Sequence, residues 1–360
     1  MSWKERTMYY IDSTNSKEHS YPVYGRQFKT YKWAKPILVG ILFAVLYLLA
    51  GGLLVMAGAV AANGGTMPSD FAGLIEDLQL GSYDTMDLAN GMQTVLSLGS
   101  IALMIPVLWI VTKVVRDRPF TSYSSSRGGW SHKVFWKTMC IGLVCVALPI
   151  VMWELFHEHH INDFQMRFTI ASFLVVTILG PLQCIAEEYV FRGLLMQTLG
   201  SWVRLPVIAV ILQAALFALA HPYDMIGKMG IFVSGMAFGL SAWLGMGIEV
   251  SSAYHICNNM SIFYMQGMNL SSITSESDME ALIFETVIAV VYIAVIFIIS
   301  RKTNWFNSVR KDDAAAWNEK YDEKIARREA KAAAKAEKRA EKNKPIGAHE
   351  ESAPGKHFKN

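Results

Sequence analysis

Charged residues are scarce in this 360-residue sequence. Asp, Glu, Lys and Arg make up 18% of the chain and hydrophobic residues 52%, with a mean hydropathy of +0.28. Soluble domains usually carry about 25% charged residues. The scarcity is sharper before residue 301, because residues 301–360 hold 16 of the 33 Lys and Arg and 10 of the 30 Asp and Glu. This composition excludes ordinary soluble domains and predicts an all-α, polytopic transmembrane helical bundle.

Cysteine is also rare, and a strong charge of either sign is absent. The four cysteines all fall in apolar stretches, so an exposed disulfide framework is excluded and the redox compartment cannot be inferred. The net charge of +3 comes from the tail, so no nucleic-acid partner is expected. No cleaved signal peptide is expected either, because a long polar segment precedes the first apolar run.

Eight apolar runs are candidates for membrane-spanning helices, each of which needs about 20 residues to cross the hydrocarbon core. The third, fifth and seventh runs fit this requirement least well, and the third becomes plausible when it is extended to residue 156. The eighth carries Glu285 near its start. The runs are residues 37–62, 91–112, 138–153, 168–186, 205–220, 229–248, 250–267 and 282–300.

Loop charge supports this count and predicts the orientation. Lys and Arg are frequent before the first span, after the second and after the eighth, whereas residues 63–90 and 269–280 contain none. Cytoplasmic loops are enriched in Lys and Arg. We therefore expect a multi-pass protein of the cell membrane with both termini in the cytoplasm.

The tail at about residues 312–344 is rich in Ala, Glu, Lys and Arg. This composition favours a helix, and its few apolar residues offer no evident face to bury. Two interpretations remain open. The tail contacts anionic lipid, where each basic residue near the surface contributes about 1 kcal/mol, or it is a solvated helix or a disordered segment.

Ionisable residues inside spans mark candidate sites, because each costs about 2.5–3.5 kcal/mol at the helix centre. Glu188 and Arg192 share a helix face at i,i+4 spacing and form a predicted pair. Glu187 lies about 100° away around the helix and is left free of that pair. The other candidates end or occupy later spans, as Phe217-x-x-x-His221 and His255-x-x-x-Asn259.

Two chemical interpretations fit a carboxylate, two imidazoles and an amide in neighbouring spans. Glu187, His221 and His255 hold a divalent metal such as zinc that activates water, or Glu187 takes the proton from water while His and Asn donors stabilise an oxyanion. Taken singly, each residue also has a structural explanation, such as helix packing or a hydrogen bond between helices.

Taken in this order, the three motifs resemble those of the CAAX protease and bacteriocin-processing (CPBP, or Abi) family. This family includes the type II CAAX prenyl endopeptidase and proteins similar to lysostaphin resistance protein A. The motifs are Glu187-Glu188-x-x-x-Arg192, Phe217-x-x-x-His221 and His255-x-x-x-Asn259. The resemblance covers roughly residues 138–300 and leaves the first two spans and the tail unexplained.

The resemblance implies a role for each motif residue. Glu187 activates the attacking water with help from His221, and His255 and Asn259 stabilise the tetrahedral oxyanion. Glu188, Arg192 and Phe217 support the site. The family is usually described as metalloproteases, although a metal-free glutamate mechanism has also been argued for it, and the sequence lacks the His-Glu-x-x-His pattern of soluble zinc proteases.

The resemblance and the spans together suggest four parts: a cytoplasmic segment (1–36), two extra spans (37–137), a CPBP-like core (138–300) and a basic cytoplasmic tail (301–360). We expect an intramembrane endopeptidase that acts on a membrane-bound or lipid-modified peptide or protein. The alternatives are a non-proteolytic bacteriocin-immunity factor or scaffold and, less favoured, a proton-coupled transporter. The oligomeric state is not predicted.

One difficulty concerns depth in the membrane. If residues 200–204 form a cytoplasmic turn, Glu187 lies about 20 Å from it and His221 about 26 Å, at 1.5 Å per residue. His255 is only about 12 Å beyond Gly247 by the same rise. Bringing the three motifs together requires strong helix tilt or a buried connection near residues 245–247.

Overall fold

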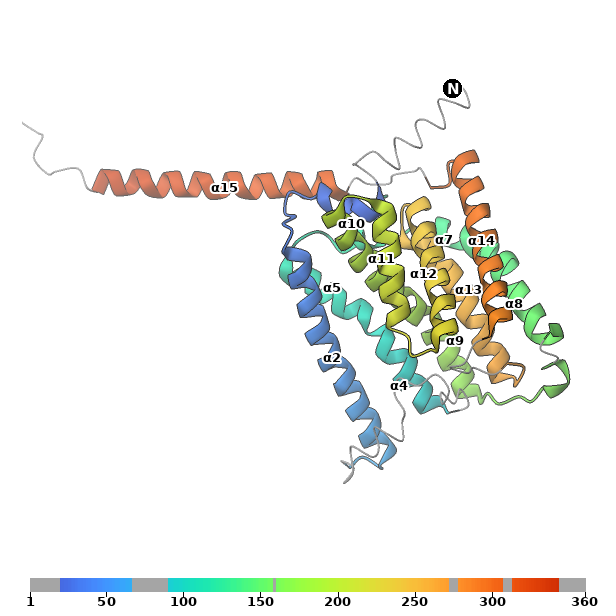
Figure 1. Cartoon of the computed structure of the whole chain (residues 1–360). Helices are drawn as coiled ribbons and strands as arrows, with labels where there is room; N and C mark the ends of the chain where they lie inside the picture. The colour runs from blue at the N-terminus through green and yellow to red at the C-terminus, as the bar shows by residue number, and fades with distance from the viewer. Residues whose placement is uncertain (1–19, 67–89, 158–159, 272–277, 307–312, 343–360) are drawn as a thin grey trace, which may run out of the picture.

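The computed structural model describes residues 20–66, 90–157, 160–271, 278–306 and 313–342. Within these ranges the chain is helical, and its β pairing is limited to an isolated bridge between Ser125 and Gly247. The prediction of an all-α bundle is confirmed (Figure 1). The helices are η1 (Tyr21–Gln27), α2 (Lys35–Ala62), α4 (Gly91–Ala102), α5 (Met104–Val115), α6 (Thr121–Ser124), α7 (His132–Gly142), η3 (Leu143–Ala147), α8 (Leu148–Met152), η4 (Trp153–His157), η5 (His160–Asp163), α9 (Ile170–Glu188), η6 (Tyr189–Met196), α10 (Gln197–Val203), α11 (Pro206–Leu219), α12 (Met225–Leu244), α13 (Ile248–Gly267), α14 (Met279–Lys302) and α15 (Asp313–Lys342).

Six helical segments in the described part of the chain are long and apolar enough to cross a membrane. All eight predicted spans are helical, so the count of about eight is approximate by this criterion. The fifth, α11, is apolar but only 14 residues long, and the seventh, α13, is long but polar. The six are Lys35–Ala61, Gly91–Val115, His132–Phe156, Ile170–Val203, Met225–Leu244 and Met279–Lys302.

The polar helix α13 lies inside the bundle. It packs against α7, α9 and α12, and most of its residues are buried, including Glu249, Ser251, Ser252 and His255. Polar side chains within a membrane protein face the bundle interior, where protein groups replace water. The position of α13 therefore explains why hydropathy alone identifies it poorly.

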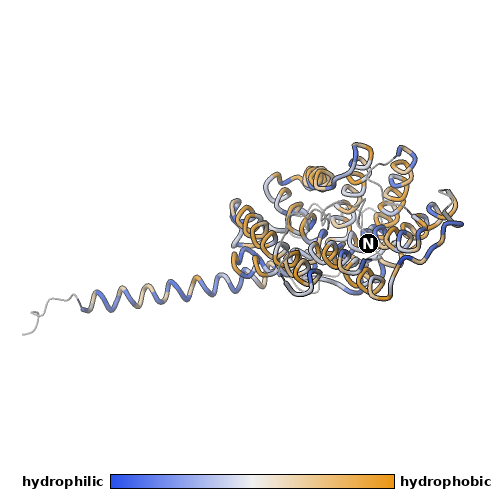
Figure 2. Tube along the Cα trace, turned by 90° about the horizontal axis from the view of Figure 1, so that it is seen from below, coloured by the Kyte–Doolittle hydropathy of each residue, from blue (hydrophilic) through white to orange (hydrophobic). Residues whose placement is uncertain are grey.

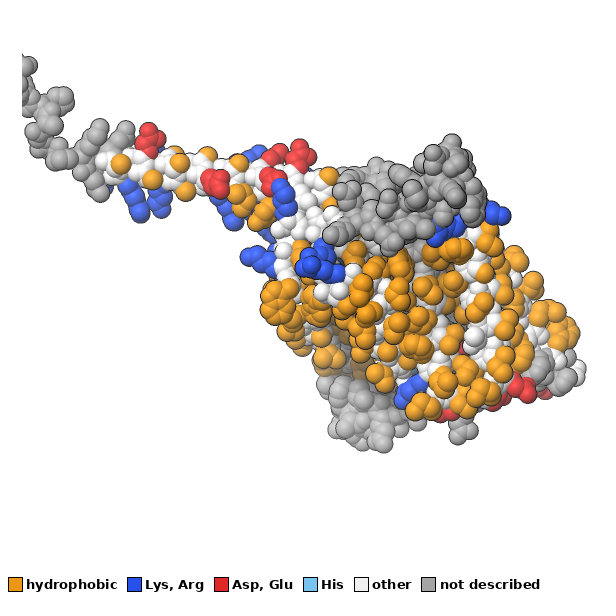
Figure 3. All heavy atoms as spheres, turned by 45° about the horizontal axis from the view of Figure 1, so that its top comes forward, with side chains coloured by type: hydrophobic (Ala, Val, Ile, Leu, Met, Phe, Trp, Pro, Cys, Tyr) orange, Lys and Arg blue, Asp and Glu red, His pale blue; other side chains and the backbone are white. Residues whose placement is uncertain are grey.

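The outer surface of the bundle is apolar. Figure 2 shows hydrophobic residues along the peripheral helices, and Figure 3 shows an almost continuous belt of hydrophobic side chains on the face in view. On α2, Leu48 is 72% exposed and Leu53 is 63% exposed. Such surfaces are stable where lipid tails surround them.

One end of the bundle is closed by segments from distant parts of the sequence (Figure 1). The Tyr21 hydroxyl of η1 donates a hydrogen bond to the Tyr123 carbonyl in the α5–α7 connection. Arg26 donates to the Ser201 carbonyl of α10 at 2.8 Å. Burial raises the pKa of the Tyr21 hydroxyl well above its ordinary value, so Tyr21 remains a neutral donor. We call the assembly of η1, residues 116–131, α10 and the first turns of α15 the end cap.

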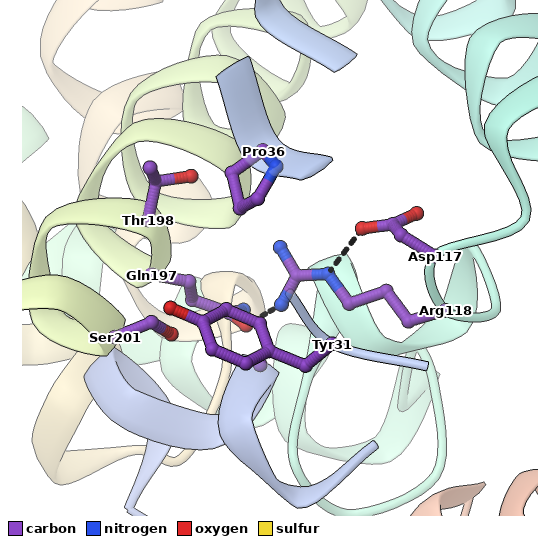
Figure 4. Close-up of a pocket in the computed structure, with 8 residues that line it drawn as sticks. Tyr31, Pro36, Asp117, Arg118, Gln197, Thr198 and Ser201 are labelled. Atoms are coloured by element: carbon purple, nitrogen blue, oxygen red, sulfur yellow. Dashed lines mark hydrogen bonds and ion pairs between the residues drawn. The ribbon is translucent and has the colours of Figure 1, made fainter. Parts of the chain in front are cut away.

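A small pocket in the end cap is built around Arg118. Its guanidinium lies between Asp117 and the Gln197 side-chain oxygen, while Tyr31 and Pro36 of the N-terminal segment lie beside it (Figure 4). Arg118 also lies 3.8 Å from the centre of the Tyr123 ring. These contacts join the N-terminal segment to the chain after α5 and to α10.

The connection between α12 and α13 is buried beneath the end cap. The Ser126 amide donates to the Met246 carbonyl at 3.0 Å, and Arg127 donates to the Gly245 carbonyl. Arg127 also forms a 2.8 Å ion pair with Glu249 in which both side chains are almost fully buried. This buried connection starts α13 below the end of the bundle. It is one of the two arrangements that the sequence requires if His255 is to reach the depth of Glu187 and His221 in the membrane.

The predicted turn at residues 200–204 is shorter than expected. The helix runs through α10 to Val203, and Arg204 ends it in a left-handed conformation (φ 64°). Gly200 lies inside α10, where an added Cβ would come within 2.0 Å of the Pro22 carbonyl oxygen. Gly200 therefore permits close packing of η1 on α10.

We predict that Gly200→Ala loosens η1 from the bundle, because the clash involves backbone that cannot move aside alone. Overpacking of this kind costs about 1–3 kcal/mol. Limited proteolysis of the purified protein should cut near residues 20–30 faster in this variant. Gly40→Ala is the matched control, since an added Cβ there meets nothing within 4 Å. Equal cleavage of both variants would contradict the prediction.

Candidate active site

The first motif lies where α9 changes geometry. Thr169 and Ser172 form a capping box at the start of α9, and the helix continues without charge to Glu187 and Glu188. Directly after them, η6 has π-helical geometry over Tyr189–Met196. Single π-helical turns inside longer helices are frequent at functional sites. The two carboxylates therefore lie at the point where the helix widens.

The predicted pair between Glu188 and Arg192 is present. Arg192 Nη1 donates to Glu188 Oε1 at 2.8 Å, and both side chains are fully buried. The guanidinium lies 4.4 Å from the centre of the Phe217 ring and 4.9 Å from that of Phe238. These contacts offset part of the free energy that the two charges lose on leaving water, although Glu188 Oε2 and Arg192 Nε are buried without a hydrogen-bond partner among the described residues.

His255 joins both carboxylates. Its Nδ1 lies 3.0 Å from Glu188 Oε1, and its Nε2 lies 3.5 Å from Glu187 Oε2. Because an ionised carboxylate only accepts, Nδ1 carries the proton that it donates to Glu188. The imidazole stacks on the Phe238 ring, with centres 4.7 Å apart. Glu188 and Phe238 therefore hold His255 with Nε2 toward Glu187.

Glu187 is also held by a chain of amides. Gln183 Nε2 donates to Glu187 Oε1 at 2.8 Å, and Asn259 Nδ2 donates to Gln183 Oε1 at 3.4 Å. Asn258 in turn donates to Asn259 at 3.2 Å. Glu187 is 6% exposed and His255 3%, whereas Asn258 and Asn259 are half-buried. Acid, imidazole and amide groups from α9 and α13 thus meet in one place.

His221 reaches this cluster through Phe217. It follows the end of α11, and its Nδ1 lies 2.7 Å from the Phe217 carbonyl, to which it donates. The Phe217 ring lies 4.6 Å from the His221 ring and 6.2 Å from the His255 ring, measured between centres. His221 is half-buried, so it lies nearer to the surface than His255.

The predicted metal ligands do not form a complete set in this arrangement. No group of three His, Cys, Asp or Glu side chains in the described ranges is placed to hold a metal ion. Glu187 and His255 provide two donors, and the other nitrogen of His255 faces Glu188. A catalytic zinc site takes three protein ligands. The residues therefore do not fit such a site here, and the metal stays a prediction.

Two residues of the site were missed in the sequence. Gln183 is one turn before Glu187, and an amide in an uncharged span is a detectable signal, although it is weaker than that of an ionisable group. Phe238 contacts both His255 and Arg192. Nothing distinguishes it in sequence from the other 17 phenylalanines.

The site falls within a segment that matches a known family. Residues 166–261 match the family described as type II CAAX prenyl endopeptidase Rce1-like. The similarity to this family concerns this segment and not the whole chain. The match confirms the resemblance inferred from the three motifs, all of which it contains, and it leaves the helices before α9, the end of α13, α14 and α15 outside. Together with the six apolar helices, it identifies a multi-pass membrane protein.

A further comparison gives a relative that matches over a longer stretch of sequence. The uncharacterized protein YyaK of Bacillus subtilis (strain 168) is 26% identical over 170 residues, which cover 43% of this chain and 55% of YyaK. The chain therefore spans about half the length of this curated relative. No solved structure matches the chain.

Proposed function

We propose that this protein is an intramembrane endopeptidase that hydrolyses a peptide bond of a membrane-associated or lipid-modified peptide or protein. The observation that carries the proposal is the approach of Glu187 to His255 at 3.5 Å inside the Rce1-like segment. A buried carboxylate beside an imidazole is the arrangement that general acid–base catalysis requires.

In the proposed mechanism Glu187 is the general base. It takes a proton from water, and the hydroxide attacks the scissile carbonyl carbon to give a tetrahedral oxyanion. Glu187 then returns the proton to the leaving amine as the C–N bond breaks, so that a carboxylic acid and an amine are formed. Gln183 supports this role, because its N–H···Oε1 bond orients the carboxylate.

The remaining motif residues have supporting roles in the proposal. His255 donates to the oxyanion from Nε2 in its protonated, imidazolium form, and Asn259 donates through the second N–H of its amide, beyond the one directed at Gln183. His221 assists in activating water from the more exposed side. Glu188 and Arg192 hold His255 in place and keep their own charges paired.

We also propose that the protein lies in the cell membrane with the end cap in the cytoplasm. The end cap brings η1, residues 116–131 and the start of α15 to the same end of the bundle. The basic loops identified in the sequence therefore belong to one side, which supports the orientation that the positive-inside rule gives.

Incubation of the purified protein with defined peptides tests the function. The peptides carry a C-terminal CAAX sequence with and without a prenyl group on Cys, and a third forms a single transmembrane helix. Fragments are identified by mass, with and without a chelator, so that the metal requirement is measured in the same assay. Specific fragments support the peptidase. Intact peptides in every arm, together with pH-dependent flux in vesicles, would identify a transporter instead.

We predict that Gln183→Leu lowers kcat by about 10- to 100-fold, because a hydrogen bond to a charged group contributes about 1.5–3 kcal/mol. KM should change little, since Gln183 orients the base rather than the substrate. Thr177→Val, on the same helix, is the control and should keep full activity. A change in KM without a change in kcat would assign Gln183 to substrate binding.

A further inference from the structure

The first turns of α15 are fixed to the end cap. Asn318 Oδ1 accepts from the Lys29 amide at 2.7 Å, and Asn318 Nδ2 donates to the Gln27 carbonyl at 2.8 Å. The Trp317 indole donates to Thr30 at 2.9 Å, and Thr121 donates to Asp313. Trp317 also packs near Tyr24, Phe28 and Ala314. The expectation that the tail has no face to bury is therefore wrong for its first turns.

Beyond these turns the helix leaves the bundle. Residues 326–340 are exposed throughout. In Figure 1, α15 runs roughly at right angles to the membrane-spanning helices, level with the end cap. A helix rises about 1.5 Å per residue, so the 30 residues of α15 extend about 45 Å along this direction, which is the plane of a membrane around the bundle.

The charges of α15 are separated onto two faces. Successive helical residues turn by about 100°, and this places all the Lys and Arg of α15 within an arc of about 120°. The exposed acids occupy an arc on the opposite side. The basic face comprises Lys320, Lys324, Arg327, Arg328, Lys331, Lys335, Lys338, Arg339 and Lys342, and the acidic face Glu319, Asp322, Glu323, Glu329 and Glu337.

This separation is unfavourable for a helix surrounded by water alone. Like charges at i,i+4 spacing destabilise an isolated helix, and opposite charges stabilise it. In α15 one opposite-charge pair has this spacing, Glu323 with Arg327 at 3.7 Å. Six pairs of basic residues have it, from Lys320–Lys324 to Lys338–Lys342, and so do the acidic pairs Glu319–Glu323 and Glu337–Glu341. An anionic surface along the basic face removes the repulsion between the basic residues.

The basic face points toward the side where lipid would lie. Figure 3 shows most Lys and Arg side chains of the projecting part of α15 on its lower edge, the side of the apolar belt. The acidic side chains gather on the upper edge and the front. Contacts at the end cap set this rotation, including the Lys29–Asp322 ion pair, which uses an acid from the opposite face.

We propose that residues 320–342 of α15 lie on the membrane surface and bind anionic phospholipid headgroups through the basic face. The end cap fixes the first turns of the helix and its rotation about its axis, and the lipid holds the outer turns at the membrane surface. The side chains of the outer turns are mainly Ala, Glu, Lys and Arg, so binding is electrostatic rather than by insertion of an apolar face. The proposal does not depend on peptidase activity.

Hydrogen exchange of the full-length protein in nanodiscs tests this proposal. One nanodisc contains phosphatidylcholine alone, and the other contains phosphatidylcholine with phosphatidylglycerol. We expect exchange of residues 320–342 to be at least about tenfold slower with the anionic lipid, and we expect the difference to diminish at high salt. Exchange of residues 313–319 should not change between the two lipids, since protein contacts hold those turns.

Two matched triple variants separate surface binding from helix stability. Lys324, Lys331 and Lys335→Gln should lose the protection given by phosphatidylglycerol. Glu319, Glu329 and Glu337→Gln should keep it, although both sets replace three charges with Gln. Equal exchange in the two lipids would overturn the proposal. The proposal would also be overturned if an added oligonucleotide slowed exchange of residues 320–342 in neutral nanodiscs while anionic lipid did not. That result would assign the basic face to nucleic acid.

Discussion

Replacing Glu187 with Gln should strongly slow peptide hydrolysis and leave the protein folded. General acid–base catalysis contributes typically 10²–10⁴-fold, so kcat should fall by about this factor. Gln has the same size and keeps an oxygen that can accept from Gln183, whose amide now bonds Glu187 Oε1 at 2.8 Å. The loss therefore isolates the base. The measurement is cleavage rate per folded molecule, with folding checked by the thermal unfolding midpoint.

Glu285→Gln is the matched control for this prediction. Glu285 is another carboxylate within a span, on α14, and it lies close to Gly230 of α12 rather than in the motif cluster. Its replacement should leave kcat within about twofold, because catalysis requires a base beside His255 and not merely an acid in the membrane. Comparable activity in Glu187→Gln and the unmodified protein would reject Glu187 as the base.

Replacing Arg192 with Met should have the largest effect on stability. The change leaves the fully buried Glu188 without its 2.8 Å partner, and breaking a buried pair from one side costs about 3–5 kcal/mol. We expect the free energy of unfolding in detergent micelles, measured by denaturant titration, to fall by this amount. The double change Glu188→Gln and Arg192→Met should recover part of the loss, since neither charge then remains buried alone.

The exposed pair on α15 provides the control for the buried pair. Glu323 and Arg327 have the same i,i+4 spacing, but their side chains are 58% and 80% exposed. Arg327→Ala should change the free energy of unfolding by less than about 1 kcal/mol, as is usual for surface pairs. If Arg192→Met were as mild as Arg327→Ala, the Glu188–Arg192 pair would not support the site.

The sequence predicts helices most reliably where lipid is the neighbour. Long apolar runs such as those of α2 and α14 are unambiguous, because backbone in lipid must be helical and side chains in lipid must be apolar. The prediction is weakest for α13, whose surroundings are other helices. The limit for α11 is its length, because 14 residues are too few to span the hydrocarbon core. The four-part division of the chain stays a prediction, although the Rce1-like match lies within the core that it proposed.

The motif residues were predictable because their chemistry is costly in a membrane. The i,i+4 spacing also predicted the Glu188–Arg192 pair, since a single helix determines it. Contacts between helices were not predictable in this way. His255 contacts Glu188 as well as Glu187, and Phe238 stacks on the His255 ring. Arg127 pairs with Glu249. All of these contacts depend on packing between segments that are distant in sequence.

The buried polarity of α13 also constrains how the protein is made. A helix that carries His255, Asn258 and Asn259 is poorly suited to enter lipid by itself, and synthesis proceeds from the N-terminus. The groups that Asn259 and His255 contact on α9, namely Gln183, Glu187 and Glu188, are synthesised earlier. α13 therefore leaves the ribosome when its partners have already been made, and its integration into the bilayer coincides with assembly of the site.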